Sequence, residues 1–248
     1  MSTYFISDLH LEESRPDIIR AFFLFLDSIQ GDADKLYILG DFFESWIGDD
    51  ENTELQLEVK QRLKALSDQG CKLYFMHGNR DFLVGDVFAQ ETGASLLEDP
   101  CVIDLAGEQT LLMHGDSLCT ADTGYMKFRA TIRNPAFLAP FLKRPIEERK
   151  ITARQLRAMS QANNQDKSNE IMDVTPEEVI RELEAHQVQS MIHGHTHRPM
   201  IHDIVANGTA AKRIVLGDWD KYVWYLKVDN MGEHHFKHYL LDDESPSI

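Results

Sequence analysis

Five polar clusters follow short, mostly apolar runs, and they constrain the fold more than any other feature of the sequence. They read Ser7-Asp8-Leu9-His10, Gly40-Asp41, Gly78-Asn79-Arg80-Asp81, His114-Gly115-Asp116 and Gly194-His195-Thr196-His197. Strand ends in α/β folds gather at one edge of the sheet, where ligands bind. Glycine lets the backbone turn sharply and bring the next side chain into the cleft. We therefore expect the five clusters to lie close together.

The hydrophobic pattern predicts an α/β chain. Buried strands are expected at 4–7, 36–39 and 73–76, with amphipathic helices between them at 18–29 and 54–66. This βαβαβ order predicts parallel strands. Shorter strands are expected at 101–105, 110–113, 190–192, 213–216, 222–228 and 235–240. A helical block is expected at 121–186, interrupted by Pro135, Pro140 and Pro145.

The helical block contains a basic segment in an acidic chain. The formal net charge of −16 argues against general nucleic-acid binding. Ten basic and five acidic residues lie at 121–170, so this segment carries about +5 and the remainder about −21. Two explanations of this basic segment are equally good: it forms a solvated helical face, or it binds an anionic partner. The chain is read as one domain, 1–248, with a helical cap insertion at about 121–170. Along that insertion, helical spacing gives one polar stripe: Lys150, Arg154, Arg157, Ser160, Asn164 and Lys167.

The five clusters supply a set of metal ligands. In an extended chain, residues i and i+2 point the same way, which predicts that Asp8 and His10 share a side and that His195 and His197 do. Oxygen and nitrogen ligands without cysteine favour Mn, Fe, Zn or Mg. A lone Asp-x-His pair is usually only hydrogen bonded, but seven candidates exceed what one ion takes, and a bridging carboxylate between two ions explains the number. The candidates are Asp8, His10, Asp41, Asn79, His114, His195 and His197.

The remaining histidines show no such spacing. His77 and His193 precede their motifs and are read as core or supporting residues. The others are read as surface or structural residues: His186, His202, His234, His235 and His238.

The order of these motifs, D-x-H, GD, GN, H and GHTH, resembles the calcineurin-like metallophosphoesterase superfamily. The resemblance implies a two-sheet β-sandwich flanked by helices, and hydrolysis of a phosphoester or phosphoanhydride with two metal ions. It also implies that Asp41 bridges the ions. One ion would be held by Asp8, His10, Asp41 and His197, and the other by Asp41, Asn79, His114 and His195.

Arg80 narrows the substrate class. In much of the superfamily a histidine follows GN and helps to protonate the leaving group. Arg80 cannot donate a proton usefully, because the pKa of arginine is above ~12, but its guanidinium can bind phosphate oxygens through two hydrogen bonds. An alkoxide leaving group needs a proton, whereas a phosphate leaving group does not. Arg80 therefore favours cleavage of a pyrophosphate over an alkyl phosphomonoester.

Together, 78–81 and the Asn163-Asn164-Gln165-Asp166-Lys167-Ser168 run resemble one branch of the superfamily, the UDP-2,3-diacylglucosamine diphosphatases of lipid A biosynthesis in Gram-negative bacteria. The resemblance extends from Asp8 through Leu216-Gly217-Asp218-Trp219. It implies that water, typically with Mn²⁺, attacks the α-phosphorus to give 2,3-diacylglucosamine 1-phosphate (lipid X) and UMP. Asn79, Arg80 and His195 would stabilise the developing charge. The implied substrate contacts are Asn79, Arg80, Asp122, Ser160, Asn164, Lys167 and His195.

The protein is expected to be cytoplasmic and to bind peripherally to the cytoplasmic face of the inner membrane. No apolar run approaches the ~20 residues of a membrane span, no signal peptide is recognised, and three cysteines without ligand spacing fit reduced thiols. The apolar run at 137–142 beside Lys143 and Arg144 suits acyl chains or an anionic bilayer; it could equally pack the cap onto the body. No protein partner is implied. One alternative is a soluble nucleotide phosphodiesterase. The other is a non-catalytic scaffold, and the complete set of candidate ligands argues against the scaffold.

Overall fold

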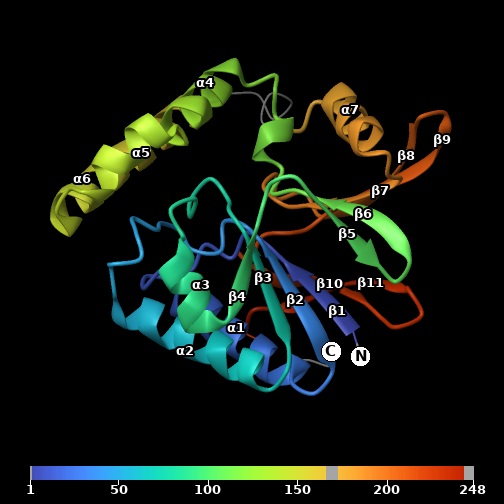
Figure 1. Cartoon of the computed structure of the whole chain (residues 1–248), viewed down its shortest axis with the longest axis horizontal. Coiled ribbons are helices and arrows are strands. Elements are labelled where there is room, and N and C mark those ends of the chain that lie inside the picture. The colour runs from blue at the N-terminus through green and yellow to red at the C-terminus, as the bar shows by residue number, and fades with distance from the viewer. Residues whose placement is uncertain (1, 166–172, 243–248) are drawn as a thin grey trace.

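A computed structural model describes residues 2–165 and 173–242, with the side chains of 161–165 left undescribed. It contains two β-sheets packed face to face, with helices outside them (Figure 1). The first sheet has the order β11-β10-β1-β2-β3-β4. Its strands are β1 (Ser2–Ile6), β2 (Ala33–Leu39), β3 (Lys72–Met76), β4 (Ala94–Leu97), β10 (Tyr222–Val228) and β11 (His234–Leu240).

The second sheet has five strands in the order β5-β6-β7-β9-β8. They are β5 (Cys101–Leu105), β6 (Glu108–Leu112), β7 (Ser190–His193), β8 (Met200–Ala206) and β9 (Thr209–Val215). Two mixed sheets flanked by helices are the architecture that the motif order implies. The predicted fold class is therefore confirmed.

The βαβαβ beginning is also confirmed. Strands β1, β2 and β3 pair in parallel, and β4 extends the parallel set. The connecting helices are α1 (Pro16–Ile29) and α2 (Glu54–Asp68). Pro16 stands in the first turn of α1, where its missing N–H costs no hydrogen bond. Thr53 caps α2 through a reciprocal capping box with Gln56.

Three apolar cores hold the layers together. The largest lies between the first sheet and helices α1, α2 and α3 (Asp86–Thr92), and includes the fully buried Phe22, Phe25 and Phe75. A second joins the two sheets through residues such as Phe5 and Ile192. The third lies beneath α7 (Pro176–His186), which covers the other side of the second sheet (Figure 1). These cores fix the strand ends relative to one another.

In its described residues, 121–165 and 173–186, the helical block divides into four helices. Helices α4 (Thr123–Ile132), α5 (Pro135–Leu142) and α6 (Ile146–Gln165) form a layer of their own beyond the strand ends, separate from α7 (Figure 1). Pro135 begins α5, and α6 begins just after Pro145. The expectation that Pro140 interrupts the block is wrong, because Pro140 lies inside α5. Pro140 has no N–H to donate to the Ala136 carbonyl, so α5 lacks one internal hydrogen bond but continues to Leu142.

Four elements were not predicted: helix α3, the short 3-10 helix η1 (Asp116–Leu118), and strands β4 and β8. Helix α3 has only seven residues. Strand β8 is the outer strand of its sheet and pairs with β9 alone. Its burial alternates from Ile201 to Ala206, but apolar Ile201 and Val205 face outward, so the sequence shows no alternation of apolar and polar residues. None of the helices in the described ranges is both long and apolar enough to cross a membrane.

Candidate metal centre

The five polar clusters converge where strands of both sheets end. Asp8, Asp41 and Asn79 follow β1, β2 and β3, whereas His114 follows β6 and His195 follows β7. Backbone hydrogen bonds join these loops directly: Asp8 N–H donates to Gly40 O at 3.1 Å, and Gly194 N–H donates to His114 O at 2.9 Å. The expected juxtaposition therefore occurs, and it spans both sheets of the sandwich.

Unusual backbone conformations are concentrated at this point. Within the described residues, eight non-glycine residues have positive φ, and five of them are candidate ligands: Asp8, His10, Asp41, His195 and His197. A left-handed backbone at a non-glycine residue is uncommon and costs on the order of 1–3 kcal/mol. Such strain, held in place by the surrounding fold, is typical of a functional site.

Two glycines allow the loops to approach one another closely. A Cβ at Gly78 would collide with the backbone N and the carboxylate of Asp41. A Cβ at Gly194 would collide with the carboxylate of Asp8 and the side chain of Ser7. Alanine at either position would therefore push candidate ligands apart.

The candidate ligands form two adjacent groups. Asp8, His10 and His197 make one group, and Asp41, His114 and His195 make the other. Within each group, the potential ligand atoms all lie within 4.8 Å of one another. Carboxylates and imidazoles without thiolate suit hard or intermediate divalent ions, so the residues present fit the implied metals.

Asp41 and Asn79 complete this arrangement. Asp41 Oδ2 lies 3.9 Å from Nε2 of His10 in the first group, and Asp41 Oδ1 lies 3.6 Å from Nε2 of His114 in the second. Asn79 Oδ1 lies 3.2 Å from the same His114 nitrogen. One carboxylate thus faces both groups, as a bridging ligand must.

The spacing argument used for the ligand pairs is wrong. Asp8 and His10 do share a group, but both have left-handed backbones and belong to no strand. His195 and His197 fall into different groups. The loop after each strand is coiled rather than extended, so the alternation of side chains along a strand does not apply to it.

Three histidines bind an outer oxygen through Nδ1, which leaves Nε2 toward the centre. His114 Nδ1 lies 2.9 Å from Leu39 O, and His10 Nδ1 lies 2.9 Å from Glu44 Oε2. His197 Nδ1 lies 3.4 Å from Asp218 Oδ2. Such outer contacts fix the tautomer and orientation of metal-binding imidazoles. The sequence reasoning missed Glu44 and Asp218, because neither has ligand spacing to its histidine.

The carboxylates of the cluster control its protonation. Burial alone would lower the pKa values of His114 and His197. Nearby carboxylates outweigh burial and raise the pKa of His114 to about 9 and that of His197 to about 10. Desolvation and the neighbouring His114 lower the pKa of the half-buried His195 to about 4. Before metal binds, His114 and His197 therefore hold protons at neutral pH.

Two buried aspartates organise the surrounding loops. Asp81 accepts hydrogen bonds from the backbone N–H groups of Gly78, Phe42 and Phe43, and so ties the Asn79 loop to the Asp41 loop. Burial, together with Asp41, raises the pKa of Asp81.

Asp116 holds the start of the cap in place through hydrogen bonds. It accepts hydrogen bonds from Tyr125 Oη and Arg129 Nε, both at 2.7 Å, and lies 3.2 Å from Arg133. Tyr125 in turn stacks on His195 with ring centroids 6.0 Å apart. Tyr125 was not among the predicted site residues, since a single tyrosine on a helix carries no pattern.

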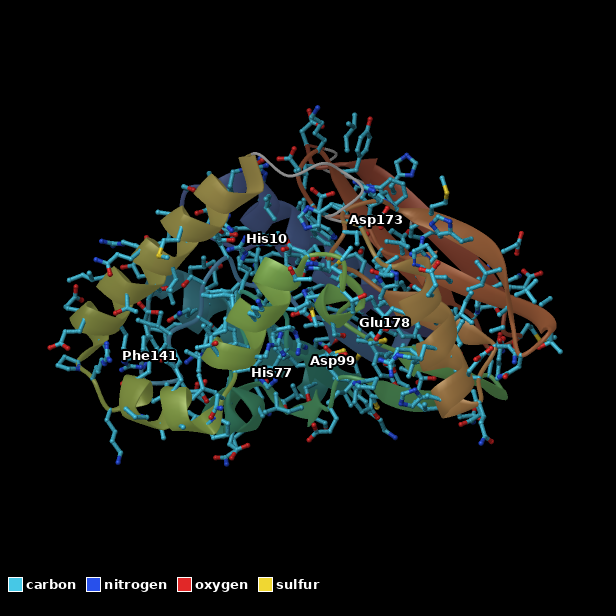
Figure 2. All side chains as sticks on the ribbon, turned by 90° about the horizontal axis from the view of Figure 1, so that it is seen from above. His10, His77, Asp99, Phe141, Asp173 and Glu178 are labelled. Carbon is cyan, nitrogen blue, oxygen red and sulfur yellow. The ribbon has the colours of Figure 1, made fainter. Side chains whose placement is uncertain are left out.

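A cavity of about 720 Å³ opens beside Asn79 and Arg80, between the body and the cap. Figure 2 shows His10 near the middle of the molecule and Phe141 toward the outer end of the cap. Most of the lining is apolar and aromatic. It includes Leu11, Phe43, Trp46, Phe82, Phe128, Phe137, Leu138 and Phe141. The polar stripe of α6 contributes Lys150, Arg154, Arg157 and Ser160.

The other predicted substrate contacts are placed differently. Asp122 does not line this cavity; it caps α4, where its carboxylate accepts the Tyr125 N–H at 3.0 Å. The side chain of Asn164 and all of Lys167 lie outside the described residues.

Comparison with known proteins agrees with this geometry. Residues 1–199 match the family model described as calcineurin-like phosphoesterase. A Marinobacter nauticus protein named UDP-2,3-diacylglucosamine hydrolase is 58% identical, over 98% of this chain and 100% of the relative. Proteins of the same name from Hahella chejuensis and Pseudomonas entomophila are 54% and 55% identical, covering 94% and 92% of this chain and 95% of each relative. The similarity therefore spans both sheets and the cap.

Proposed function

The chain belongs to the calcineurin-like phosphoesterase family, and within it to the UDP-2,3-diacylglucosamine hydrolases, and we propose that it cleaves the pyrophosphate of UDP-2,3-diacylglucosamine into lipid X and UMP. The observation that carries this proposal is the position of Asp41. Its two carboxylate oxygens face two separate groups of ligand atoms beside a cavity lined by Arg80. A non-catalytic scaffold has no need of such an arrangement.

In the proposed assignment, two divalent ions occupy these groups. One would be held by Asp8, His10, Asp41 and His197, and the other by Asp41, Asn79, His114 and His195. The oxygen and nitrogen donors support Mn²⁺ as the ion. Bound there, the ions would lower the pKa of water and neutralise charge on phosphoryl oxygens.

The remaining chemistry belongs to residues beside the ligands. Arg80 is proposed to bind the phosphoryl oxygens with its planar guanidinium. No partner of Arg80 Nε is found in the described part of the chain, so this donor is available to a substrate. Asn79 and His195 would stabilise charge that develops at the α-phosphorus as water attacks. The leaving phosphate of lipid X needs no proton.

The cavity supports a lipid substrate over a small soluble nucleotide. Phe137, Leu138 and Phe141 of α5 face it, as do aromatic residues of the body, which favours acyl chains as the occupants. The basic stripe of α6 would lie along the anionic diphosphate. We treat 121–170 as a cap of a single domain, 1–248, that covers this substrate.

Attachment to the cytoplasmic face of the inner membrane is part of the proposal. Leu142 is 43% exposed at the end of α5, and Lys143 and Arg144 beside it are exposed as well. An exposed leucine flanked by two cations suits an anionic bilayer surface, from which the substrate would enter the cavity.

The test is hydrolysis of UDP-2,3-diacylglucosamine in H₂¹⁸O with Mn²⁺, with mass spectrometry of both products. Attack at the α-phosphorus places one ¹⁸O in UMP and none in lipid X. The variant Asp41→Ala should lose activity more completely than His10→Ala, because the bridging carboxylate sets the ~3.5–4 Å metal spacing. Label in lipid X would contradict the attack site, and equal turnover of UDP-glucose would favour a nucleotide phosphodiesterase.

A further inference from the structure

Glu44 binds two residues that lie far apart in the sequence. Its Oε2 lies 2.9 Å from Nδ1 of His10, and its Oε1 forms an ion pair with the guanidinium of Arg157 on α6. The Glu44 backbone is fixed as well, because its N–H donates to Leu11 O at 3.2 Å. One carboxylate therefore contacts a candidate metal ligand and the cap.

The contact with His10 has the geometry of an orienting interaction. His10 Nε2 lies 3.4 Å from Nε2 of His197 and 3.9 Å from Asp41 Oδ2, so this nitrogen faces the metal groups. Nδ1 must then carry the proton, and this N–H donates a hydrogen bond to the Glu44 carboxylate. A carboxylate in that place holds the imidazole in one tautomer and one orientation, and makes it a better ligand.

The contact with Arg157 differs from the neighbouring links between cap and body. Lys150 pairs with Glu51 at 3.3 Å, and Arg149 pairs with Asp50. Among the described residues, neither Glu51 nor Asp50 forms a hydrogen bond or ion pair with a candidate ligand. The Glu51–Lys150 pair therefore provides a matched control, since it lies between the same loop and the same helix.

We propose that Glu44 is a positioning residue that couples the cap to the metal centre. It orients His10 toward one metal ion and, with the same carboxylate, holds α6 in place through Arg157. This inference rests on the metal ligands of the proposed function. Because coupling between two equilibria is reciprocal, metal binding should also secure α6.

The first measurement is the affinity of each Mn²⁺ site, by calorimetric titration with metal analysis of the dialysed protein. In Glu44→Ala one of the two ions should bind about 10- to 100-fold more weakly, the usual effect of losing an outer partner of a ligating histidine. Glu44→Gln should recover part of the loss, because its amide oxygen still accepts the His10 proton. Glu51→Ala should bind both ions as the wild type does.

The second measurement is hydrogen exchange of α6 over 150–160, with and without saturating Mn²⁺. In the wild type and in Lys150→Met, metal should slow exchange. In Glu44→Ala and Arg157→Met, the metal-dependent slowing should disappear, because the link from His10 to the helix is broken.

The outcomes separate this inference from the proposed function. A wild-type protein that binds fewer than two ions contradicts the dinuclear centre itself. Two ions bound with unchanged affinity in both Glu44 variants overturn the positioning role alone. Slowing of α6 that persists in Glu44→Ala at saturating metal overturns the coupling. Thermal unfolding of each variant shows whether a loss of affinity reflects general destabilisation.

Discussion

Arg80 combines a fixed backbone with a side chain that lines the cavity. Its N–H donates to Asp41 Oδ1 at 2.8 Å, and its carbonyl accepts the Trp46 N–H at 3.2 Å. A substitution should therefore change the side chain without moving the loop. Arg80→Lys keeps the charge but loses the planar fork that binds two phosphoryl oxygens. We expect kcat/KM to fall by roughly 100-fold with metal content unchanged, measured by steady-state kinetics and elemental analysis. A parallel loss of metal would make Arg80 a structural residue.

The raised pKa values of His114 and His197 predict that metal affinity depends on pH. At about 9 and about 10, both pKa values lie above neutrality, so both imidazoles are protonated in the metal-free protein at pH 7. A protonated imidazole cannot bind a metal ion, and binding must release about two protons. Apparent Mn²⁺ affinity should rise with pH and level off above about pH 10. Calorimetry at pH 7 in buffers of different ionisation enthalpy measures the release; heats that do not depend on the buffer would contradict it.

At the residue scale, the sequence identified ligand candidates but could not describe their surroundings. Asp8, His10 and Asp41 were recognisable because each follows an apolar run in a motif. Glu44 and Asp218 were not, because their contacts with His10 and His197 arise only when the loops fold together. The left-handed backbone that aims Asp8 and His10 leaves no mark on hydrophobic periodicity.

At the scale of elements, the beginning of α6 is anchored to the body by one buried arginine. Arg149 is 1% exposed, and its guanidinium donates to Ile47 O at 2.6 Å and Asp50 Oδ1 at 2.8 Å. Gly48, with φ of +135°, leaves room for it, since a Cβ there would collide with the guanidinium. This contact therefore joins the cap to the body, and the cavity lies between these two parts.

Removal of that anchor should loosen the cap without unfolding the body. Arg149→Met loses several hydrogen bonds to a charged group, which should lower the free energy of local opening of α6 by about 2 kcal/mol. Hydrogen exchange of α6 should then be roughly 30-fold faster, while strands β1 to β3 exchange as before. Lys150→Met, which breaks a more exposed ion pair, should accelerate exchange of α6 much less than Arg149→Met does. Equal acceleration throughout the molecule would show that Arg149 supports the global fold instead.

Elements were predictable where local periodicity governs them. The parallel strands β1, β2 and β3 are buried apolar runs, and the helices between them carry one apolar face, so sequence spacing was sufficient. Helix α3 was missed because it is short, and strand β8 because apolar Ile201 and Val205 face outward and hide its alternation. The position of the cap depends on contacts such as Arg149 with Asp50, between segments far apart in the chain, and no periodicity encodes them.

At the scale of the whole molecule, charge is divided between body and cap. The segment 121–170 carries about +5 within a chain of net charge −16, so an anionic surface should attract the cap and repel the body. The apolar run 137–142 contributes to both faces of the cap: Phe141 is buried, whereas Leu142 is 43% exposed next to Lys143 and Arg144. The two explanations of this run therefore concern different residues, the inner ones for the cavity and the outer ones for a bilayer.

This division predicts that membrane binding and hydrolysis can be separated. The double variant Lys143→Glu and Arg144→Glu should weaken binding to anionic liposomes by more than about 2 kcal/mol, since each neutralised cation near such a surface accounts for about 1 kcal/mol. Sedimentation with phosphatidylglycerol vesicles measures this loss. Hydrolysis of detergent-dispersed substrate should remain near the wild-type rate, because neither residue lines the cavity. The control is the double reversal of Lys64 and Lys72, which changes net charge equally on the body. If both double variants bind liposomes equally weakly, net charge alone governs attachment; if the cap variant also loses hydrolysis in detergent, its charges support the substrate cavity instead.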